Sequence, residues 1–471
     1  MSAVPQPNAA NHPDSHPDNH PELIGALADY VANIKLAEVP AEVRKQAKFC
    51  ILDTIGATVA GSRTDDWHPL LKAEAADNAK PEATVIGAGR KLSTEAAARV
   101  NAYMGDIFEL NDLIGGHGSI GNVSALVALA ETLGSSGAQL VEAVIVGLEV
   151  TARVYFGYYP AMKPFTDVGM NPVTFPSSLG VAAGAARLMG LTTQQAADAM
   201  GIGGTLAGWC PAEVVFGDGG TVKPMLFGAC PATSGLTGAK YARAGMTGPK
   251  YLLEGPRGYF VTAAKRMFPE AVLDRQTWYV GQPRRKYHAC CGYIHSPIDV
   301  VAAMRRDGID FDDVHEIRIG VASLTVPAVS KSRPPTSPND ARFHLEYCVA
   351  LAALGDDVIV PEHSLDFATQ LQRPEVQALM KKVRVVDDPA QKHYHQCAVI
   401  LLDAGGRDLA RREGKGPKGS PQNPLSDAEM RDKFRRLVQF KLPTAAIDDY
   451  LARVDTLDRA TDWHWLVDAF D

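Results

Sequence analysis

Residues 180–186 read Gly-Val-Ala-Ala-Gly-Ala-Ala and lie within a predicted helix over residues 177–189. Small side chains at this density let helix backbones approach closely, which is typical of a tight helical core. Apolar residues recur with helical spacing on both sides of this stretch, and they predict further helices at about residues 94–112, 122–134, 136–156, 192–200 and 222–244. The sequence therefore predicts an all-helical domain in which strands are scarce.

The pattern changes near residue 265, where apolar and polar residues begin to alternate as they do in strands. Strands are predicted at residues 315–321, 382–386 and 396–403, with helices between them at about 296–306 and 342–354. Residues 406–424 are basic and rich in Gly and Pro, which is typical of a surface loop. Ser426 and Glu429 then form a capping box that opens another helix.

The predicted fold is mainly α, with two domains. Residues 21–265 and 406–471 form a large helical domain, and residues 266–405 form a smaller α+β domain. A chain of 471 residues is long enough for two cores. Residues 1–20 are polar and contain several prolines, which predicts a disordered tail. Three histidines in this tail have metal-ligand spacing, but the intervening prolines prevent the helix that would align them: His12, His16 and His20.

The composition is that of an ordinary globular protein, with 46% hydrophobic and 21% charged residues. The net charge of −7 argues against a nucleic-acid partner, because phosphate binding requires clustered basic residues. Seven cysteines without regular spacing indicate a reducing compartment. No apolar run reaches the roughly 20 residues of a membrane-spanning helix. We therefore expect a cytoplasmic protein with neither a nucleic-acid nor a membrane partner.

Three acidic residues precede a histidine in a glycine-rich turn. Asp106, Glu109 and Asp112 are three apart, so on a helix they would share one face, which is normally a solvated stripe. The glycines on either side of His117 let a ligand approach the backbone. A histidine exposed there can give or take a proton near neutral pH. A loop histidine without a role is the alternative.

A lysine follows a second glycine-rich segment, residues 216–222 (Phe-Gly-Asp-Gly-Gly-Thr-Val). Lys223 lies near a predicted helix start, where free backbone N–H groups help to bind an anion. The segment is not a nucleotide-binding P-loop, because its spacing differs and Pro224 stands where that pattern requires a hydroxyl residue. An exposed lysine without a ligand is the alternative.

Residues 286–295 read Lys-Tyr-His-Ala-Cys-Cys-Gly-Tyr-Ile-His. Two cysteines and two histidines suggest a zinc site, but adjacent cysteines do not match the usual ligand spacing. Buried thiols beside a loop that lines the substrate site are favoured, and no metal or cofactor is expected. Arg284 opens a short basic run that would either attract an anionic substrate or form a solvated loop.

Several motifs, in the same order along the chain, resemble the MmgE/PrpD family, whose members include 2-methylcitrate dehydratase, cis-aconitate decarboxylase and iminodisuccinate epimerase. The resemblance covers about residues 22–460 and rests on segments 51–57, 101–119, 182–191, 219–223, 286–295 and 339–347. It implies a large helical domain with a smaller α+β domain. It also implies a cofactor-free, commonly dimeric enzyme whose active site lies in a cleft between the domains.

The resemblance also implies roles for individual residues. His117 matches the family's histidine after the acidic segment, and Lys223 matches its lysine after the glycine loop. The family's Asp-Phe-Asp-Asp appears here as Glu-Leu-Asn-Asp, which begins at Glu109 and ends at Asp112. The predicted catalytic residues are therefore His117 and Lys223, with Asp112 or Glu109 orienting or tuning the imidazole.

The predicted substrate-binding residues depart from the family pattern. Asn171 stands where dehydratases and decarboxylases of the family have a histidine, and asparagine orients a carboxylate but cannot transfer a proton. Ser330 stands near the position of a tyrosine that the decarboxylases carry. The predicted substrate-binding set is Asn171, Ser330, Arg284, His288 and His295.

These expectations predict a cofactor-independent lyase, either a hydro-lyase or a decarboxylase, that acts next to a carboxylate of a small polycarboxylic acid. Lys223 would hold the substrate carboxylate and stabilise developing charge, while His117 moves the proton. The alternatives are an epimerase of an iminodisuccinate-like dicarboxylate and a non-catalytic anion-binding homologue. The expected assembly is a homodimer.

Overall fold

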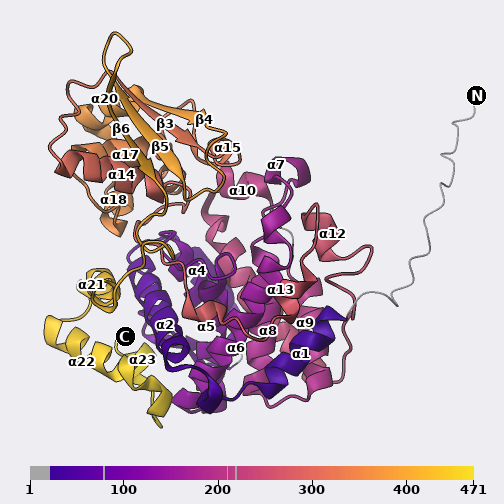
Figure 1. Cartoon of the computed structure of the whole chain (residues 1–471). Helices are drawn as coiled ribbons and strands as arrows, with labels where there is room; N and C mark the ends of the chain where they lie inside the picture. Colours follow the sequence, from indigo (N-terminus) through magenta and orange to yellow (C-terminus); the bar gives the residue numbers. More distant parts are fainter. Residues whose placement is uncertain (1–21, 78–79, 209, 218–219) are drawn as a thin grey trace, which may run out of the picture.

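The computed structural model describes residues 22–77, 80–208, 210–217 and 220–471, which form two parts of unequal size (Figure 1). The larger part is helical, and the smaller part carries the main sheet. The predicted tail and the three histidines within it lie outside the described residues. Within the described ranges, no helix combines the length and apolar character needed to cross a membrane.

The first half of the chain is mostly helical. Its helices are α1 (Leu23–Asn33), α2 (Ala41–Gly61), α3 (His68–Ala76), α4 (Thr94–Asp106), α5 (Gly118–Leu133), α6 (Gly137–Phe156), α7 (Phe165–Val168), α8 (Thr174–Leu188), α9 (Thr193–Thr205), α10 (Ala212–Phe216), α11 (Cys230–Arg243), α12 (Tyr259–Ala263) and α13 (Pro269–Leu273). A π-helical turn, Met225–Ala229, leads into α11. A small antiparallel hairpin, β1 (Ala83–Val85) and β2 (Arg90–Leu92), lies before α4.

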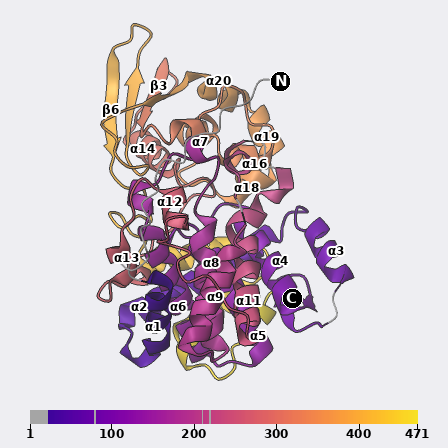
Figure 2. The ribbon, with the colours of Figure 1, turned by 90° about the vertical axis from the view of Figure 1, so that its right-hand side faces the viewer.

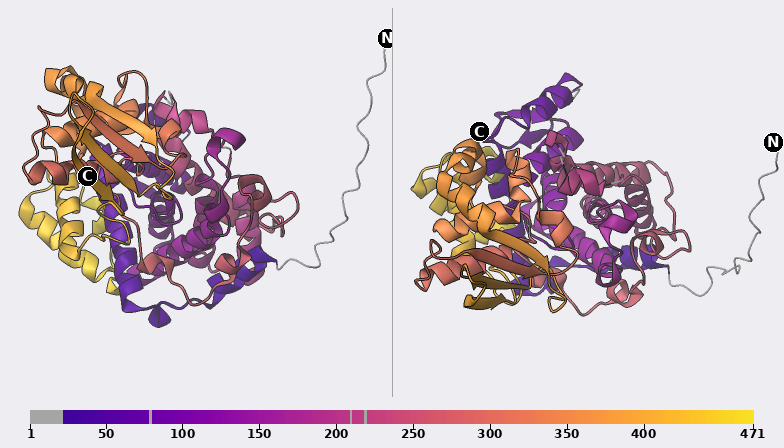
Figure 3. Two further views of the ribbon diagram at one scale, coloured as in Figure 1. Left: turned by 45° about the horizontal axis from the view of Figure 1, so that its top comes forward. Right: turned by 90° about the horizontal axis from the view of Figure 1, so that it is seen from above.

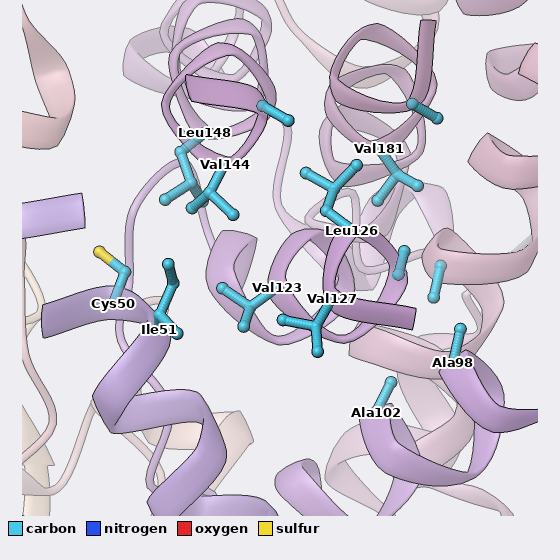
Figure 4. Packing of buried hydrophobic residues seen from close by; sticks show 14 of the residues in the cluster. Cys50, Ile51, Ala98, Ala102, Val123, Leu126, Val127, Val144, Leu148 and Val181 are labelled. Atoms are coloured by element: carbon cyan, nitrogen blue, oxygen red, sulfur yellow. The ribbon is translucent and has the colours of Figure 1, made fainter. Parts of the chain in front are cut away.

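Helix α5 is the centre of the larger core and is buried along almost its whole length. Its side chains Val123, Leu126 and Val127 lie among side chains of the neighbouring helices (Figure 4). Helices α6 and α8 cross so closely that a Cβ atom on Gly180 would lie 2.3 Å from the carbonyl oxygen of Gly147. The tight helical core predicted from residues 180–186 is confirmed.

The smaller part contains a four-stranded sheet with helices around it. Its elements are α14 (His295–Arg306), β3 (Glu316–Val321), α15 (Val326–Val329), α16 (Pro338–Arg342), α17 (Leu345–Leu354), α18 (Pro361–Leu365), α19 (Phe367–Gln372), α20 (Pro374–Lys382), β4 (Val383–Asp387), β5 (Cys397–Leu402) and β6 (Asp408–Gly414). The strand order is β4-β3-β5-β6, with β3 and β4 parallel and the other pairs antiparallel. Helices α14 and α17 pack against this sheet (Figure 3).

The end of the chain returns to the larger part. Helices α21 (Asp427–Val438), α22 (Thr444–Asp455) and α23 (Trp465–Asp468) complete the chain, and α21 and α22 pack against α2 (Figures 1 and 2). The predicted cap of α21 is confirmed, since Ser426 Oγ accepts a hydrogen bond from the Glu429 backbone N–H at 3.3 Å. The mainly α, two-part architecture is confirmed, while the boundaries near residues 265 and 405 stay a prediction.

Two local predictions are wrong. Strand β6 lies inside the segment 406–424, which was predicted as a loop. The prediction failed because this strand is exposed at the sheet edge and carries charged residues in place of alternating apolar ones. The helix predicted over residues 94–112 ends at Asp106. Glu109 has a φ of +53°, a left-handed conformation that a continuing helix cannot contain.

Candidate active site

A pocket between the two parts is lined by three of the residues that the sequence singled out for chemistry, Glu109, His117 and Asn171. It is open to solvent at its mouth, and the space between its walls is about 690 Å³ when the open solvent at the mouth is counted. Glu109, His117 and Asn171 line it from the larger part, and Phe343 and Tyr394 line it from the smaller part. The cleft position expected for the active site therefore coincides with a real cavity.

His117 lies immediately before α5 and is partly accessible from the pocket. Its ring stacks on Phe227, with centroids 4.2 Å apart and planes inclined by 26°. Its Nδ1 lies 2.8 Å from Oδ1 of Asn111. A carbonyl oxygen can only accept a hydrogen bond, so Nδ1 carries the proton and Nε2 of the neutral ring is left free to take one.

The orientation of the Asn111 amide is set by a buried carboxylate. Asn111 Nδ2 donates to Oδ1 of Asp106 at 3.0 Å, and both side chains are fully buried. Because a carboxylate accepts this bond, the nitrogen end of the amide faces Asp106 and the oxygen end faces His117. Asp106 and Asn111 thus act on His117 as a fixed chain that selects one tautomer of the imidazole.

Burial and the nearby charge of Lys286 lower the pKa of His117 well below its ordinary value. Both causes disfavour the imidazolium form. The ring is therefore neutral at physiological pH. A neutral histidine with Nε2 unprotonated can act as a general base.

A compact group of buried charges lies beside His117. Glu109 bridges two ammonium groups, contacting Lys223 with one carboxylate oxygen and Lys286 with the other, the latter at 2.5 Å. Asp106 Oδ2 lies 3.4 Å from Lys223 Nζ. The backbone of Glu109 is left-handed, with a φ of +53°. We call Asp106, Glu109, Lys223 and Lys286 the charge cluster.

Burial, together with the positive charges of Lys286 and Arg342, lowers the pKa of Lys223 to about 8, against the opposing effect of Asp106. Burial also lowers the pKa of Lys286 and raises that of Asp106. Lys223 therefore titrates near physiological pH, where it can both stabilise a developing negative charge and donate a proton.

Asp106, Glu109 and His117 also offer ligand atoms that lie within 4.8 Å of one another, a spacing that a metal ion can bridge. The two carboxylates already neutralise Lys223 and Lys286. A divalent cation at this point would be repelled by both ammonium groups. The donor set therefore fits an ion-pair cluster better than a metal site.

Asp112 does not orient His117, contrary to the prediction. Its carboxylate lies behind the pocket, where Oδ2 accepts from Arg285 Nη1 at 3.1 Å and also from the Ser119 hydroxyl. Since α4 ends at Asp106, Asp112 does not share a helix face with the other two acids. The imidazole partner is Asn111, and neither Glu109 nor Asp112 takes that place.

Of the predicted substrate-binding residues, Asn171 lines the pocket and the other four do not. His288 is buried with both ring nitrogens engaged, by Asp299 at 3.0 Å and by the Ile359 backbone N–H at 3.2 Å. The remaining three have partners of their own: Arg284 donates to Tyr394 Oη, His295 Nε2 faces the Cys290 carbonyl, and Ser330 donates to Glu346. Arg284 thus contacts a residue that lines the pocket, and none of the four lines it directly.

Sequence reasoning did not identify Asn111 or Lys286 as site residues. Asn111 was noted only as a departure from the family's acidic segment, and Lys286 only as part of a basic run and as the first residue of the segment 286–295. The sequence did contain a signal for Asn111, which lies between acidic residues and His117. An amide placed between a carboxylate and a histidine donates to the first and accepts from the second, and so fixes the direction of both hydrogen bonds. The spatial contact, however, depends on the break at Glu109.

Replacing Asn111 with aspartate should move the acidic limb of the pH–activity profile to higher pH. A carboxylate beside Nδ1 favours the imidazolium form and so raises the pKa of His117, which must lose its proton to act as a base. The measurement is kcat/KM against pH for wild type and Asn111→Asp. Asn111→Leu, which removes the partner without adding charge, should lower activity by about tenfold without that displacement. If the acidic limb does not move in Asn111→Asp, residue 111 does not influence the pKa of His117.

Comparisons with known proteins agree with this architecture. The MmgE/PrpD N-terminal domain matches residues 25–270, and the MmgE/PrpD C-terminal domain matches residues 288–456. The chain is 28% identical to the cis-aconitate decarboxylase-like protein oryM of Aspergillus oryzae, over 93% of this chain and 94% of that protein. It is 26% identical to a cis-aconitate decarboxylase of Aspergillus terreus, over 93% of each, and 25% identical to that of Mus musculus, over 93% and 91%.

Proposed function

Because the chain belongs to the MmgE/PrpD family, we propose that it is a lyase that acts next to the carboxylate of a small carboxylic acid. The cis-aconitate decarboxylases among its relatives support this reaction class. The observation that carries the proposal is a neutral histidine, His117, beside the buried ammonium group of Lys223. One group takes a proton and the other stabilises charge or gives a proton.

In the proposed mechanism, the substrate carboxylate binds beside Lys223, whose charge lowers the energy of the carbanion-like species that forms at the neighbouring carbon. His117 Nε2 removes a proton from that carbon when the reaction is a dehydration, and Lys223 protonates the departing hydroxide. When the reaction is a decarboxylation, the carbon–carbon bond breaks, carbon dioxide leaves, and Lys223 protonates the carbon that keeps the electron pair. No step of either route uses a cofactor.

Asn171 adds no further acid or base to the pocket, because an amide neither gives nor takes a proton at physiological pH. An epimerase would have to use His117 and Lys223 on opposite faces of the carbon, so Asn171 is proposed to bind substrate. Asn171 lines the pocket. Its side-chain oxygen accepts from the Val173 backbone N–H at 3.3 Å, which leaves the amide N–H₂ group as a donor for a substrate oxygen.

Proton NMR of the purified protein with pooled carboxylic acids in D₂O tests the proposal. A lyase gives new olefinic signals, loss of substrate signals, or exchange of the proton beside a carboxylate. An epimerase gives exchange and a new diastereomer without olefins. Binding without any exchange or conversion across the pool would favour an anion-binding protein over an enzyme.

Activity should fall as the pH rises through about 8, because the pKa of Lys223 is lowered to about 8 and the proposed role requires the ammonium form. Below that pH the lysine is protonated and active, and above it the charge is lost. Arginine keeps its charge to a much higher pH. In Lys223→Arg the residual activity should therefore lose this alkaline limb. If the alkaline limb of the pH–activity profile stays near pH 8 in Lys223→Arg, that limb reports the titration of another group.

A further inference from the structure

The three basic residues 284–286 differ in their partners. Arg285 and Lys286 each form an ion pair with a buried carboxylate, at 3.1 and 2.5 Å. Within the described ranges Arg284 forms no such ion pair, and its Nη1 donates to the hydroxyl oxygen of Tyr394 at 3.0 Å. Arg284 therefore carries a positive charge that no acidic residue in the described part of the chain neutralises.

The imidazoles beside Tyr394 do not supply a compensating charge. His393 stacks on Tyr394 with centroids 4.2 Å apart, and His395 lies 4.3 Å from the same ring. Burial, followed by the positive charge of Arg284, lowers the pKa of His393 to about 4 and that of His395 to about 3. Both imidazoles are therefore neutral at physiological pH, and the charge of Arg284 acts on its surroundings unopposed.

Tyr394 lines the pocket from the smaller part of the molecule. Because its oxygen accepts from Arg284, its own proton is available for a second partner. The hydroxyl of Tyr159, which also lines the pocket, is close to that of Tyr394, and burial raises the pKa of Tyr159 so that it stays protonated. Phenolic donors backed by a guanidinium charge are suited to bind an anionic oxygen.

These donors lie close to the charge cluster. Burial lowers the pKa of Lys286, and Tyr394 is near enough to act on it in the opposite direction. Phe343, another residue that lines the pocket, lies 5.0 Å from Lys223 Nζ. A compact molecule can therefore reach both the charge cluster and Tyr394.

A second substrate carboxylate would require a positive charge of its own, because a carboxylate that leaves water without one loses its hydration at a high cost. The two ammonium groups of the charge cluster already face Asp106 and Glu109. Arg284 has no such acidic partner among the described residues, and it contacts the pocket wall through Tyr394. This point of the wall is therefore the place where a further negative charge is stabilised.

We propose that Tyr394 is a specificity-determining residue whose hydroxyl donates a hydrogen bond to a second carboxylate of the substrate. Arg284 is the positioning residue that holds this hydroxyl and supplies the opposing charge. The proposal rests on the proposed function, which places the first carboxylate beside Lys223. The substrate then spans both parts of the molecule, since Lys223 belongs to the larger part and Tyr394 to the smaller one.

Calorimetric binding of two probe acids to the full-length protein tests the proposal. Succinate carries two carboxylates, and succinamate has an uncharged amide of nearly the same shape in place of one of them. We expect succinate to bind at least about tenfold more tightly, because a charge-assisted hydrogen bond is lost in succinamate. Equal affinities for the two acids, or no binding of succinate, would overturn the proposal.

Variants locate this preference at the proposed residues. Tyr394→Phe and, separately, Arg284→Gln should reduce the preference for succinate by about fivefold or more, since each removes part of the charge-assisted interaction. Arg284→Lys keeps the positive charge and should retain most of the preference. A purely structural effect would lower both affinities alike and leave their ratio unchanged. A preference that survives in both Tyr394→Phe and Arg284→Gln would contradict the assignment.

Tyr287→Phe is the matched control. Tyr287 is half-buried and also lies beside an arginine, with the guanidinium carbon of Arg436 5.1 Å from its ring centroid, but it lines a different cavity. This variant should keep the preference of wild type. An equal loss of preference in Tyr287→Phe would remove the assignment to Tyr394.

The pooled acids in D₂O, measured on the same variants, separate this proposal from the proposed function. A succinate preference that depends on Tyr394, without exchange or conversion of any acid, supports the second carboxylate site and counts against the lyase. Conversion by wild type, together with a preference that survives in both variants, supports the lyase and overturns the second carboxylate site.

Discussion

Replacing His117 with alanine should lower kcat by about two to three orders of magnitude, which is the usual contribution of a positioned general base. His117 is the partly accessible imidazole of the pocket, and its free Nε2 is the atom proposed to take the proton. The substitution leaves a space beside Phe227. Imidazole added to the buffer should occupy this space and restore part of the activity. The measurement is kcat with and without imidazole.

His363→Ala is the matched control for this experiment. His363 is part-buried in α18 and hydrogen-bonds the backbone of Val360, away from the pocket. It should keep kcat close to that of wild type and show no response to imidazole. Near-wild-type turnover in His117→Ala would remove this residue from the mechanism, whatever the thermal stability of the variant.

The sequence predicts the helices and strands wherever apolar periodicity is strong. Helix α6 and strands β3 and β5 lie within two residues of their predicted bounds, because each has a side that is buried in a core. Strand β6 was not predicted because it has no side that is buried in a core. Its residues are exposed or half-buried, and most of its side chains are charged. Edge strands of this kind carry little periodic signal.

The candidate site is predictable in part, and the missing part depends on one backbone break. His117 and Lys223 are recognisable from their glycine-rich surroundings, and both lie at the site. The link from Asp106 through Asn111 to His117 requires that α4 stop at Asp106 and that Glu109 turn into a left-handed conformation. A helical pattern that continues to residue 112 conceals that break. Periodicity reports which residues are apolar, and it does not report where a helix must end to form a site.

The aromatic residues that line the pocket could not be predicted for a different reason. Six of them lie on α6, on the turn Tyr159–Ala161 after it, on α7, on α10 and on loops of the smaller part, far apart in the sequence: Tyr155, Tyr159, Phe165, Phe216, Tyr293 and Phe343. Isolated aromatic residues are expected in any core, so none of them is a signal by itself. The packing of the two parts against each other brings the rings to one cavity.

Replacing Lys223 with methionine should have the second large effect, and it should act on turnover and on stability together. Turnover should fall by about two to three orders of magnitude, because the charge that stabilises the developing carbanion is lost. The free energy of unfolding should fall by about 3–5 kcal/mol, because Glu109 and Asp106 lose a buried partner. Chemical denaturation and kcat, measured on the same preparation, report the two effects.

Lys48→Met separates the two effects, because Lys48 is also a largely buried lysine in an ion pair, 2.9 Å from Asp458, but lies outside the pocket. Its loss should lower the free energy of unfolding as well and leave turnover per folded molecule near that of wild type. If both variants are destabilised alike and both keep turnover, the Lys223 ammonium contributes to folding alone. If only Lys223→Met loses turnover, the difference lies in the position of the Lys223–Glu109 pair. This pair borders the pocket, so the charge of Lys223 acts on the substrate as well as on the stability of the fold.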